Sequence, residues 1–551
     1  MKKISLLITL IFAFALNSLA KPRTAEQMKA AAAAVLNTQT MAKGLNFSAA
    51  DVTLIDSRSQ TVIYGNAGGY AVVSKDDTFS PILGYSDTAM SDNPAPAFLW
   101  WLETINKSME NMLAKGTKPQ HVQPAPEYRT SVPELLTTRW GQDTPYNLQC
   151  PEYTVNNVKD NYVTGCVATA MAQIMKYHNY PEKGYGKTIY RLNPGDGATL
   201  TIEADFGNTT YDWANMLDSY IPGRYNDEQA NAVATIMYHC GVSVRMNYAK
   251  DGSGAFSYDA CTALRTNFLY DKNIKHYSRD FMPNEEWMNI IYRELNDNCP
   301  ILYGGVTTAN AGHAFVFDGY DADGLVHVNW GWNGESNGYY DVESLNGFSE
   351  GQNMVIIRLP NDDRFESQYH SMWGLGYKLV ITKTITALKV SCDALYNMDV
   401  DKFTGELALM ALNTETGDKT NLSTIYGTNV LSGIKYGSGM SLSGVSVPYT
   451  QLSDGTYRIY LATKSTLETD WQPVHSNETI NNSYILVKNG SNVTLRAENN
   501  SNWTTAIDNV PTVEKKADNR IYSIDGRYLG TDVDKLDRGM YIRNGVKFVK
   551  K

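Results

Sequence analysis

The stretch TGCVATAMAQIMKYHNYP, residues 164–181, predicts a helix that begins beside a cysteine. One face of this helix would carry Val167, Met171, Ile174 and Met175. Thr164 is a candidate N-cap, and Pro181 ends the run. Cys166 then lies in the first turn, where free backbone N–H groups and the helix dipole lower the pKa of a thiol. This position predicts a reactive thiolate, although a lone cysteine at a helix start is more often a small packing residue.

A thiolate nucleophile needs a partner that accepts and returns protons. His313, in NAGHAFVFDGYD, lies far downstream of Cys166, and this order of cysteine and histidine is that of papain-type enzymes. Two other histidines compete for the role. His178 would lie at the far end of the same helix as Cys166, and His327 alternates along a predicted strand, which favours a structural role.

The imidazole also needs a group that fixes its tautomer, and an acyl transfer needs a donor for the developing oxyanion. Asn329, in HVNWGWNGESNGYY, offers a side-chain amide, with Trp330 and Trp332 beside it to exclude water. Gln142, in TTRWGQDTPYN, offers a second amide that can act together with the Cys166 backbone N–H. Each residue alone indicates little. The ordered set that points to a cysteine nucleophile is Gln142, Cys166, His313 and Asn329.

The segments GCVATAMAQIMKYHNYP, GHAFVFDGYD and HVNWGWNGESNGYY resemble motifs of the streptopain family of papain-like cysteine peptidases. WGQDTPYN resembles the oxyanion-glutamine segment of that family. The resemblance covers roughly residues 133–360 and implies a papain-like fold of two subdomains with a cleft between them. It also implies that Cys166 is the nucleophile, that His313 is the general base and acid, and that Gln142 is the oxyanion donor.

The resemblance further implies that Asn329 orients the histidine and that Trp330 shields it. KDGSGAFS, residues 250–257, resembles a Gly/Ser loop of the family's substrate cleft. The residues expected to bind substrate are Gly252, Ser253, Gly254 and Trp332. Small residues let a peptide backbone approach closely, although this loop equally suits a turn that leads into a helix.

Members of the family are zymogens, and residues 22–115 resemble their propeptide, including GYAVVSKDD and PILGYS. The helix and strand patterns in this region predict a compact unit of its own. We expect the chain's own propeptide to act as an inhibitor that lies against the cleft. Cleavage within roughly residues 115–135, around the exposed, Pro-rich linker 116–133, would then release it.

The local patterns predict an α+β fold for the catalytic region and an all-β region after it. Helices are expected at 25–37, 96–114, 166–178, 226–244 and 257–270, and strands at 301–306, 313–321, 324–330 and 338–342. From about Tyr377, short runs alternate in period 2, which is typical of a β-sandwich. The predicted domains are a signal peptide at 1–20, an inhibitory propeptide at 21–130, a papain-like peptidase domain at 131–375, a β-sandwich at 376–508 and a sorting-like β-module at 509–551.

The amino terminus, MKKISLLITLIFAFALNSLA, has the form of a signal peptide: two lysines, a short apolar core and small residues at its end. The apolar core is too short to span a bilayer comfortably. The tail, IYSIDGRYLG followed by GMYIRNGVKFVKK, is similar to C-terminal sorting domains of exported proteins in the Bacteroidetes lineage. Together these segments predict a protein that is secreted or attached to the outer membrane and cell surface.

The 551 residues carry a formal net charge of −10, which disfavours a nucleic acid or an anionic membrane as the partner. The six cysteines form no CxxC pair, so zinc ribbons are not expected, while disulfides stay open. DADG at 321–324 lacks the ligand ladder of a calcium loop and suits a turn. Motifs of nucleotide, dinucleotide and zincin enzymes are absent from the sequence, and no cofactor or metal is expected.

The sequence therefore predicts an exported cysteine endopeptidase that processes itself and acts on protein or peptide substrates. Two alternatives remain. The papain-like region could be a non-catalytic scaffold of a secreted binding protein that works through its β-sandwich. The catalytic set could also serve another acyl transfer, such as transpeptidation or bile-amide hydrolysis.

Overall fold

A computed structural model describes residues 21–40, 48–119, 121–194, 199–250, 252–306, 312–343, 350–362, 370–437 and 439–498, with short segments at 521–523, 528–530, 533–536, 538–543 and 546–550. The chain divides into a large unit, 1–362 with 367–501, and a small unit, 502–551 with 363–366. The predicted signal peptide, residues 1–20, lies outside the described residues.

The amino-terminal region of the large unit is built from two helices and four strands. They are α2 (Ala25–Thr40), β1 (Thr53–Ser57), β2 (Thr61–Asn66), β3 (Gly69–Ser74), β4 (Ile82–Ser86) and α3 (Pro96–Lys115). Helix α2 begins at the residue that the sequence indicated, and α3 agrees within one residue. Helix α3 has Pro96 in its first turn and ends at Gly116, which adopts a left-handed conformation with φ 65°.

The catalytic region adds helices and a second set of strands. Its first elements are β5 (Glu152–Val155), β6 (Val158–Asn161), α4 (Cys166–His178), β7 (Lys187–Leu192), β8 (Leu200–Asp205), the short 3-10 helices η2 (Phe206–Asn208) and η3 (Trp213–Asn215), α5 (Asp227–Ser243) and α6 (Ser257–Thr266). The later elements are β9 (Lys275–Ser278), η4 (Arg279–Phe281), α7 (Asn284–Asn296), β10 (Ile301–Val306), β11 (Gly312–Tyr320), β12 (Val326–Asn329), β13 (Gly338–Tyr340) and β14 (Glu350–Ile356). The sequence analysis missed α7, although Trp287, Ile291 and Leu295 recur at helical spacing and are buried.

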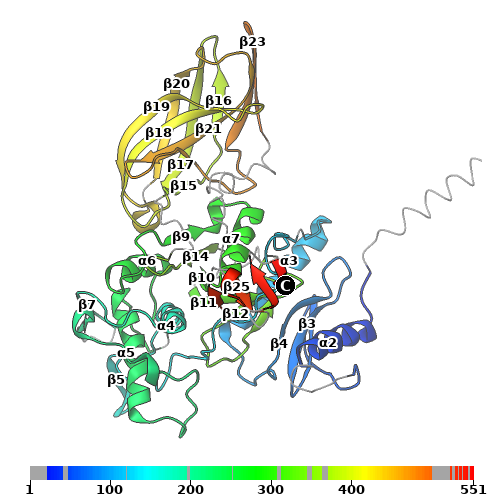
Figure 1. Cartoon of the computed structure of the whole chain (residues 1–551), viewed down its shortest axis with the longest axis vertical. Coiled ribbons are helices and arrows are strands. Elements are labelled where there is room, and N and C mark those ends of the chain that lie inside the picture. The colour runs from blue at the N-terminus through cyan, green and yellow to red at the C-terminus, as the bar shows by residue number, and fades with distance from the viewer. Residues whose placement is uncertain are drawn as a thin grey trace, which may run out of the picture. The chain divides into compact units, whose positions relative to one another are not determined.

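The strands of these two regions form one sheet of ten, in the order β1-β2-β3-β4-β13-β12-β11-β10-β14-β9 (Figure 1). The junction is antiparallel and pairs Tyr339 with Tyr85 and Tyr340 with Gly84. Residues 22–115, expected to form a compact unit of their own, thus share one sheet with the catalytic region, although helix α2 packs on a small core within this region. An edge strand presents unpaired N–H and C=O groups, and here the edges of two sheets satisfy each other.

The sheet face that α3 covers has an aromatic core shared by the amino-terminal and catalytic regions. The Trp101 and Tyr340 rings lie 4.8 Å apart, and the Trp101 indole N–H donates to the Asp341 carbonyl at 2.9 Å. The Tyr70 and Tyr340 hydroxyls are 2.7 Å apart. Through these contacts the amino-terminal region shares a buried core with the catalytic region.

Helix α4 is the centre of the second core, which α5, α6 and the β7–β8 hairpin complete. The sequence predicted one apolar face, but every residue from Val167 to Met175 is buried. A helix buried on all sides needs small residues among its large ones, which Ala168, Ala170 and Ala172 supply. The helix has the predicted bounds, Cys166–His178, and packs on β11.

The linker 116–133 is only partly the exposed segment that its composition indicated. Lys115, Gly116 and Lys118 are exposed. From Val122 onward the chain lies on the catalytic region: the Val122 N–H donates to the Glu343 carboxylate at 2.9 Å, and Val132 forms a bridge with Tyr320. Backbone hydrogen bonds to the sheet thus hold a segment that proline-rich composition alone reads as free.

The carboxyl-terminal part of the large unit is a β-sandwich, and the predicted α+β fold with a following all-β region is confirmed. Its elements are β15 (Trp373–Leu375), β16 (Val380–Lys383), β17 (Ala387–Asn397), β18 (Phe403–Asn413), β19 (Lys419–Val430), α8 (Gly433–Tyr436), β20 (Gly439–Pro448), β21 (Gly455–Ser465), β22 (Gln472–Pro473), β23 (Ser483–Asn489) and β24 (Asn492–Ala497). One sheet has the order β15-β17-β16 with β20 against β17, and the other has the order β19-β18-β21-β23-β24 with β22 against β21. Their facing apolar side chains form a separate core.

The small unit is a four-stranded sheet in the order β26-β25-β27-β28. Its elements are β25 (Ile521–Ser523), β26 (Tyr528–Gly530), η6 (Val533–Lys535), β27 (Gly539–Arg543) and β28 (Val546–Lys550). The strands fall in the two tail segments that the sequence singled out. The sorting role of the tail stays a prediction.

Candidate active site

Cys166 is the first residue of α4, so its position in the opening turn of a helix is as the sequence indicated. The N-cap, however, is Gly165 and not Thr164, and Gly165 has φ 89°. A Cβ at Gly165 would lie 2.6 Å from the Met246 side chain and 2.9 Å from the Ser253 carbonyl oxygen. Only glycine fits this approach and this backbone conformation, because it has no side chain.

His313 is the second residue of β11 and pairs with Gly305 of β10. Its Nε2 lies 3.0 Å from the carbonyl oxygen of Trp330. A carbonyl oxygen only accepts hydrogen bonds, so Nε2 carries the proton and donates. In the neutral ring, Nδ1 is then the unprotonated atom that can take the proton of the Cys166 thiol.

The cysteine and the histidine form a coupled pair. Burial raises the pKa of the Cys166 thiol, but the hydrogen bond and positive charge of His313 outweigh burial. The backbone N–H groups of Ala314 and Val167 add to the same effect, so the pKa of Cys166 lies below its ordinary value. Burial lowers the pKa of His313, but the Cys166 thiolate and the Trp330 carbonyl raise it above its ordinary value. Both shifts favour the thiolate–imidazolium form of the pair over the neutral form.

Other thiols in the chain have the opposite character. All six cysteines are free, which settles the disulfide question that the sequence left open. Burial raises the pKa of Cys150 and of Cys261 to about 12 and that of Cys392 to about 11. At these three thiols burial outweighs every other influence, so they stay protonated and inert.

The hydrogen bond that was predicted between Asn329 and His313 is not formed. The Asn329 amide is buried and donates to the Thr138 carbonyl at 2.8 Å, and its oxygen accepts from the Gly331 N–H at 3.1 Å. The backbone of the next residue, Trp330, turns its carbonyl to the ring instead. Side-chain chemistry favoured the amide, because nothing in a sequence shows which way a backbone carbonyl points.

The Trp330 indole is buried, and the Phe315 ring lies between it and His313. It packs at 4.9 Å from Phe315, whose ring lies 6.0 Å from that of His313. The indole N–H donates to the Ser336 carbonyl at 2.9 Å, which fixes the plane of the side chain. Shielding of the histidine by Trp330 thus stays a prediction, with Phe315 as the ring in contact.

Gln142 is tied to the nucleophile segment through the backbone. Its carbonyl accepts from the Thr164 N–H at 3.1 Å, two residues before Cys166. The preceding Trp140 carbonyl accepts from the Asn333 N–H at 3.1 Å, which links this segment to the loop after Trp330. The structure therefore brings the three predicted motifs together, while the action of the Gln142 amide on an oxyanion stays a prediction.

The predicted substrate loop lies at the cleft. The Ser253 hydroxyl donates to the Val163 carbonyl at 2.6 Å, and Gly254 pairs with Asn247 through two backbone hydrogen bonds of 3.1 and 2.9 Å. Ser253 and Gly254 line the cleft that holds Cys166. Gly252, with φ 152°, precedes them, and a Cβ there would meet nothing within 4 Å.

Trp332 is only partly buried and packs against the aromatic core under α3, and it is not among the described residues that line the cleft. The two competing histidines are also accounted for. His178 Nδ1 lies 3.2 Å from the Tyr270 hydroxyl at the far end of α4, and His327 Nδ1 lies 2.5 Å from Asp318 Oδ1 in the interior. Both are structural in this fold.

Cys166 and His313 open into a cleft of about 870 Å³. Its described lining comes from the catalytic region and, unexpectedly, from the β-sandwich at Tyr396, Met398, Gly433 and Ile434. None of these lining residues comes from 21–119, so the expectation that the propeptide lies against the cleft does not hold for the described part of the chain. The propeptide-like region is bound at the β13 edge of the sheet instead.

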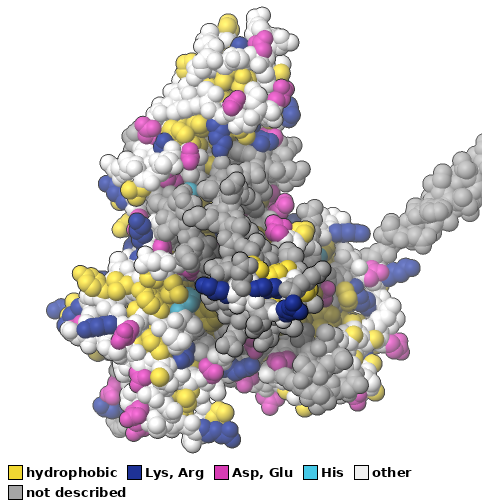
Figure 2. Space-filling view, viewed as in Figure 1, with side chains coloured by type: hydrophobic (Ala, Val, Ile, Leu, Met, Phe, Trp, Pro, Cys, Tyr) yellow, Lys and Arg dark blue, Asp and Glu magenta, His cyan; other side chains and the backbone are white. Residues whose placement is uncertain are grey.

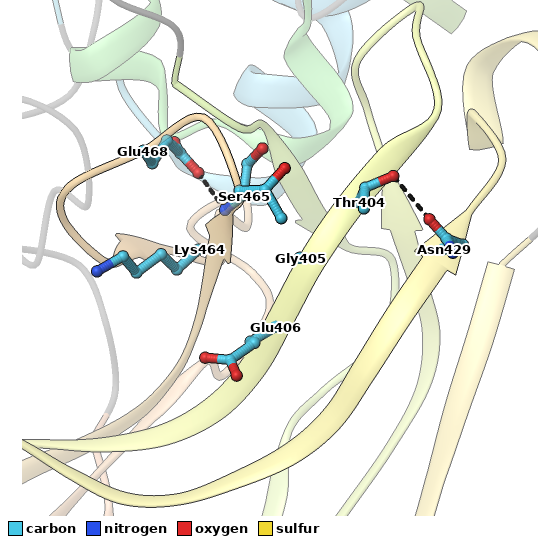
Figure 3. A pocket seen from close by; sticks show the side chains of 8 residues that line it. Thr404, Gly405, Glu406, Asn429, Lys464, Ser465 and Glu468 are labelled. Carbon is cyan, nitrogen blue, oxygen red and sulfur yellow. Dashed lines mark hydrogen bonds between the residues drawn. The ribbon is translucent and has the colours of Figure 1, made fainter.

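A second pocket, of about 530 Å³, lies on the sandwich (Figure 3). Its polar groups are largely used on one another: Glu468 accepts from the Ser465 N–H at 2.6 Å, and the Thr404 hydroxyl donates to Asn429 at 2.7 Å. This pocket offers no paired nucleophile and base. The cleft at Cys166 is therefore the candidate site.

Among the described residues, no three or more His, Cys, Asp or Glu side chains gather where they could bind a metal ion. The described helices include none with the length and apolar character to cross a bilayer. Figure 2 shows acidic and basic side chains dispersed over the visible faces of the catalytic region and sandwich.

The chain is similar to known proteins over the segment that carries these site residues. The model of the Peptidase C10 family matches residues 140–340, a range that holds Gln142, Cys166, His313 and Asn329. Streptopain from Streptococcus pyogenes is 36% identical over 312 residues, which are 53% of this chain and 75% of streptopain. A solved fragment of Prevotella intermedia prointerpain A with a cysteine-to-alanine substitution is 40% identical and has a TM-score of 0.51, covering 58% of this chain and 99% of the fragment.

The chain belongs to the Peptidase C10 family. The predicted relation to streptopain is thereby confirmed, and so is the papain-like α+β fold of the catalytic region. Another relative, the thiol protease/hemagglutinin PrtT of Porphyromonas gingivalis, is 29% identical over 441 residues. The match takes in 74% of this C10 chain and 48% of PrtT, so the chain spans about half the length of that relative.

Sequence reasoning missed three features of this C10 site. The Trp330 carbonyl and the Ala314 N–H act through the backbone, and residue identity gives no signal for either. The residues of the sandwich that line the cleft were also missed, because their distance along the chain from Cys166 says nothing of their distance in space.

Proposed function

We propose that this C10 chain is an exported cysteine endopeptidase, made as a zymogen, that hydrolyses peptide bonds in proteins. The observation that carries the proposal is the Cys166–His313 pair, in which the thiol pKa is lowered and the imidazole pKa is raised. A binding scaffold gains nothing from a thiolate in a cleft, whereas acyl transfer requires one.

The geometry supports a two-step reaction. The Cys166 thiolate attacks the carbonyl carbon of the scissile peptide bond, and the oxyanion forms near the N-terminus of α4, where the first N–H groups have no partner within the helix. We propose that the Gln142 amide supplies a further donor. His313 gives its Nδ1 proton to the leaving amine and then takes a proton from the water that hydrolyses the thioester.

We propose that residues 21 to about 118 are a propeptide and that processing occurs in the exposed part of the linker. Support comes from the match over the prointerpain A fragment and from the exposure of Lys115, Gly116 and Lys118. Val122 and Val132 are hydrogen-bonded to the catalytic region, whereas a run of exposed residues precedes Val122, so we expect a protease to cut in that run.

Export and surface attachment are proposals that rest on the two ends of the sequence. Residues 1–20 have the charge and hydropathy of a signal peptide, and the tail resembles a sorting module. Fractionation of cells that produce the tagged chain, with and without residues 509–551, would show whether the tail governs release. An unchanged distribution would contradict the proposed role.

The test of function is intact mass over time for the chain that lacks residues 1–20, beside its Cys166→Ala twin, under reducing conditions. We expect only the parent to lose about the first hundred residues and then to cleave casein. If neither changes, and a parent trimmed by another protease cleaves nothing, the peptidase proposal fails. Product analysis with added amines separates hydrolysis from transfer to another acceptor.

A further inference from the structure

The floor of the cleft runs across four neighbouring strands of the sheet. Lining residues come from β11 at Gly312 and His313, from β10 at Gly305 and Val306, from β14 at Gly351 and Asn353, and from β9 at His276 and Ser278. In β14 and β9 the lining residues are two apart and share a face, and the residues of all four strands line the same cleft. Strands lie about 4.8 Å apart, which places β9 about 14 Å from the strand of the catalytic histidine.

Beyond β9, at the end of the sheet, the cleft is lined by residues of the β-sandwich. Helix η4 follows β9 directly, and its Phe281 meets the Tyr396 ring of β17 edge to face, with centroids 5.9 Å apart. Met398 and Ile434 line the same end of the cleft. These apolar side chains share the cleft lining with the Asp280 carboxylate. Burial lowers the pKa of the neighbouring His276 to about 4, so its ring is uncharged at neutral pH.

Ion pairs fix this wall to the catalytic region. The Lys275 Nζ lies 2.7 Å from Asp399 Oδ1, and their side chains are only 11% and 8% exposed. The Arg265 guanidinium binds Asp401 through two contacts of 2.6 and 3.1 Å.

Helix α8, which carries Ile434, is held in the same way. Lys435 lies 3.4 Å from Asp259 of α6, two residues after the cleft residue Ser257. The Ser432 hydroxyl caps the helix by accepting from the Lys435 N–H at 3.2 Å. Ion pairs in the β17–β18 connection and at α8 thus hold the wall against the catalytic region, and a fixed wall can select among substrates.

We propose that the β-sandwich is the far wall of the substrate cleft, where Tyr396 and Ile434 bind an apolar side chain of an extended peptide about four residues from the scissile bond. The spacing follows from the width of the four strands and a rise of about 3.3 Å per extended residue. The occupant is a segment of the protein substrate, since the wall is continuous with the cleft that holds Cys166 and His313. This inference rests on the proposed function.

The test measures cleavage of short and long peptides by the mature enzyme, which retains its β-sandwich. All share the residues next to the scissile bond. The short peptide ends within two residues of that bond, and the long peptides extend by up to five residues on either side, with leucine or serine at the distal positions. We expect the parent to favour leucine over serine once the extension reaches about four residues on one side.

Tyr396→Ala and Ile434→Ala should raise KM for the favoured long peptide about five- to tenfold. They should leave kcat, and kcat/KM for the short peptide, within about twofold of the parent. Tyr396→Phe keeps the ring and should restore the preference. Tyr436→Ala is the matched control, because Tyr436 lies on the same short helix as Ile434 but is 61% exposed and does not line the cleft.

Three outcomes are decisive. The proposal is supported if Tyr396→Ala and Ile434→Ala no longer favour leucine over serine at the distal position and at least one of them unfolds at the parent's temperature. Equal effects on short and long peptides, or none on either in folded variants, overturn it. If the parent cleaves neither peptide and an epoxysuccinyl peptide does not label Cys166, the proposed function fails first and the wall fails with it.

Discussion

His313 donates a hydrogen bond from Nε2 to the carbonyl oxygen of Trp330, 3.0 Å away. This backbone contact fixes the tautomer in which Nδ1 serves Cys166, a role that papain-like reasoning gave to the side chain of Asn329. Trp330 is in turn buried against Tyr340, with ring centroids 5.6 Å apart, and Tyr340 is the residue that the propeptide-like region covers. His313 is thus joined to the sheet junction through one tryptophan.

The pH dependence of Cys166 labelling follows from the coupled pair. The pKa of Cys166 is lowered, so the thiolate persists below the ordinary thiol pKa of about 8.5 and is lost only as pH falls through the lowered value. The pKa of His313 is raised, so the imidazolium persists above about 6.5. Alkylation by iodoacetamide should therefore be fast at neutral pH, and peptidase activity should decline as pH rises through the His313 value.

His313→Ala is the matched variant for this profile. Without the imidazolium, burial still raises the thiol pKa, so the pH midpoint of Cys166 labelling should rise by at least about one unit. One unit corresponds to about 1.4 kcal/mol of lost interaction between the thiolate and the imidazolium. A midpoint that stays in place would show that helix α4 alone lowers the thiol pKa. Cys166→Ala should remove the labelled site, because the other cysteines are buried.

Asn329→Ala separates orientation from scaffolding. It leaves the Thr138 carbonyl without the amide donor and deprives the Gly331 N–H of its acceptor, so the free energy of unfolding should fall by about 1–3 kcal/mol. Denaturant unfolding measures the loss. The pH profile of Cys166 labelling should stay the same in folded protein. A shifted profile would mean that Asn329 acts on the His313 ring itself.

Gly165→Ala should damage both stability and chemistry. The new Cβ would meet Met246 and the Ser253 carbonyl, and φ 89° disfavours any residue but glycine. Gly186→Ala is the control, since Gly186 has φ 71° but open space around it. The control should cost about 1–2 kcal/mol with normal labelling of Cys166. Gly165→Ala should cost more and slow labelling, and equal behaviour of the two variants would contradict the packing argument.

Trp101→Ala tests the hold of the propeptide-like region on the catalytic region. The side chain is fully buried, contacts Tyr340 and donates to Asp341, so the zymogen should lose about 3–5 kcal/mol of unfolding free energy. Latency should weaken, which appears as faster self-processing by intact mass. Leu99→Ala, on the same helix and 36% exposed, is the control. The mature enzyme should not depend on either substitution.

Much of the catalytic region could be predicted because its signals are local. Helix α4 keeps its predicted bounds, because its apolar run lies between local start and stop signals, although the caps are Gly165 and Asn179 and not the predicted Thr164 and Pro181. Strand β10 likewise follows from a short β-prone run between turns. The amphipathic helix α7 was open to the same reasoning and was missed.

The joined sheet could not be predicted, because β4 and β13 pair across more than two hundred residues of sequence. Strand patterns show that an edge exists but not which edge meets it. The same limit hid the wall at Tyr396, which belongs to a β-sandwich whose sequence carries no mark of a substrate site.

The sequence by itself determined the family and singled out Cys166 and His313 as candidate nucleophile and base, because both stand in dense motifs whose meaning depends on neighbours a few positions away. Tertiary structure decided which group holds the histidine, where the propeptide-like region binds and what closes the cleft. The physical reason is that backbone carbonyls, sheet edges and apolar surfaces occur throughout the chain and carry no local sequence signal. Only their placement in space selects the Trp330 carbonyl, the β13 edge and the Tyr396 ring from the many that the chain offers.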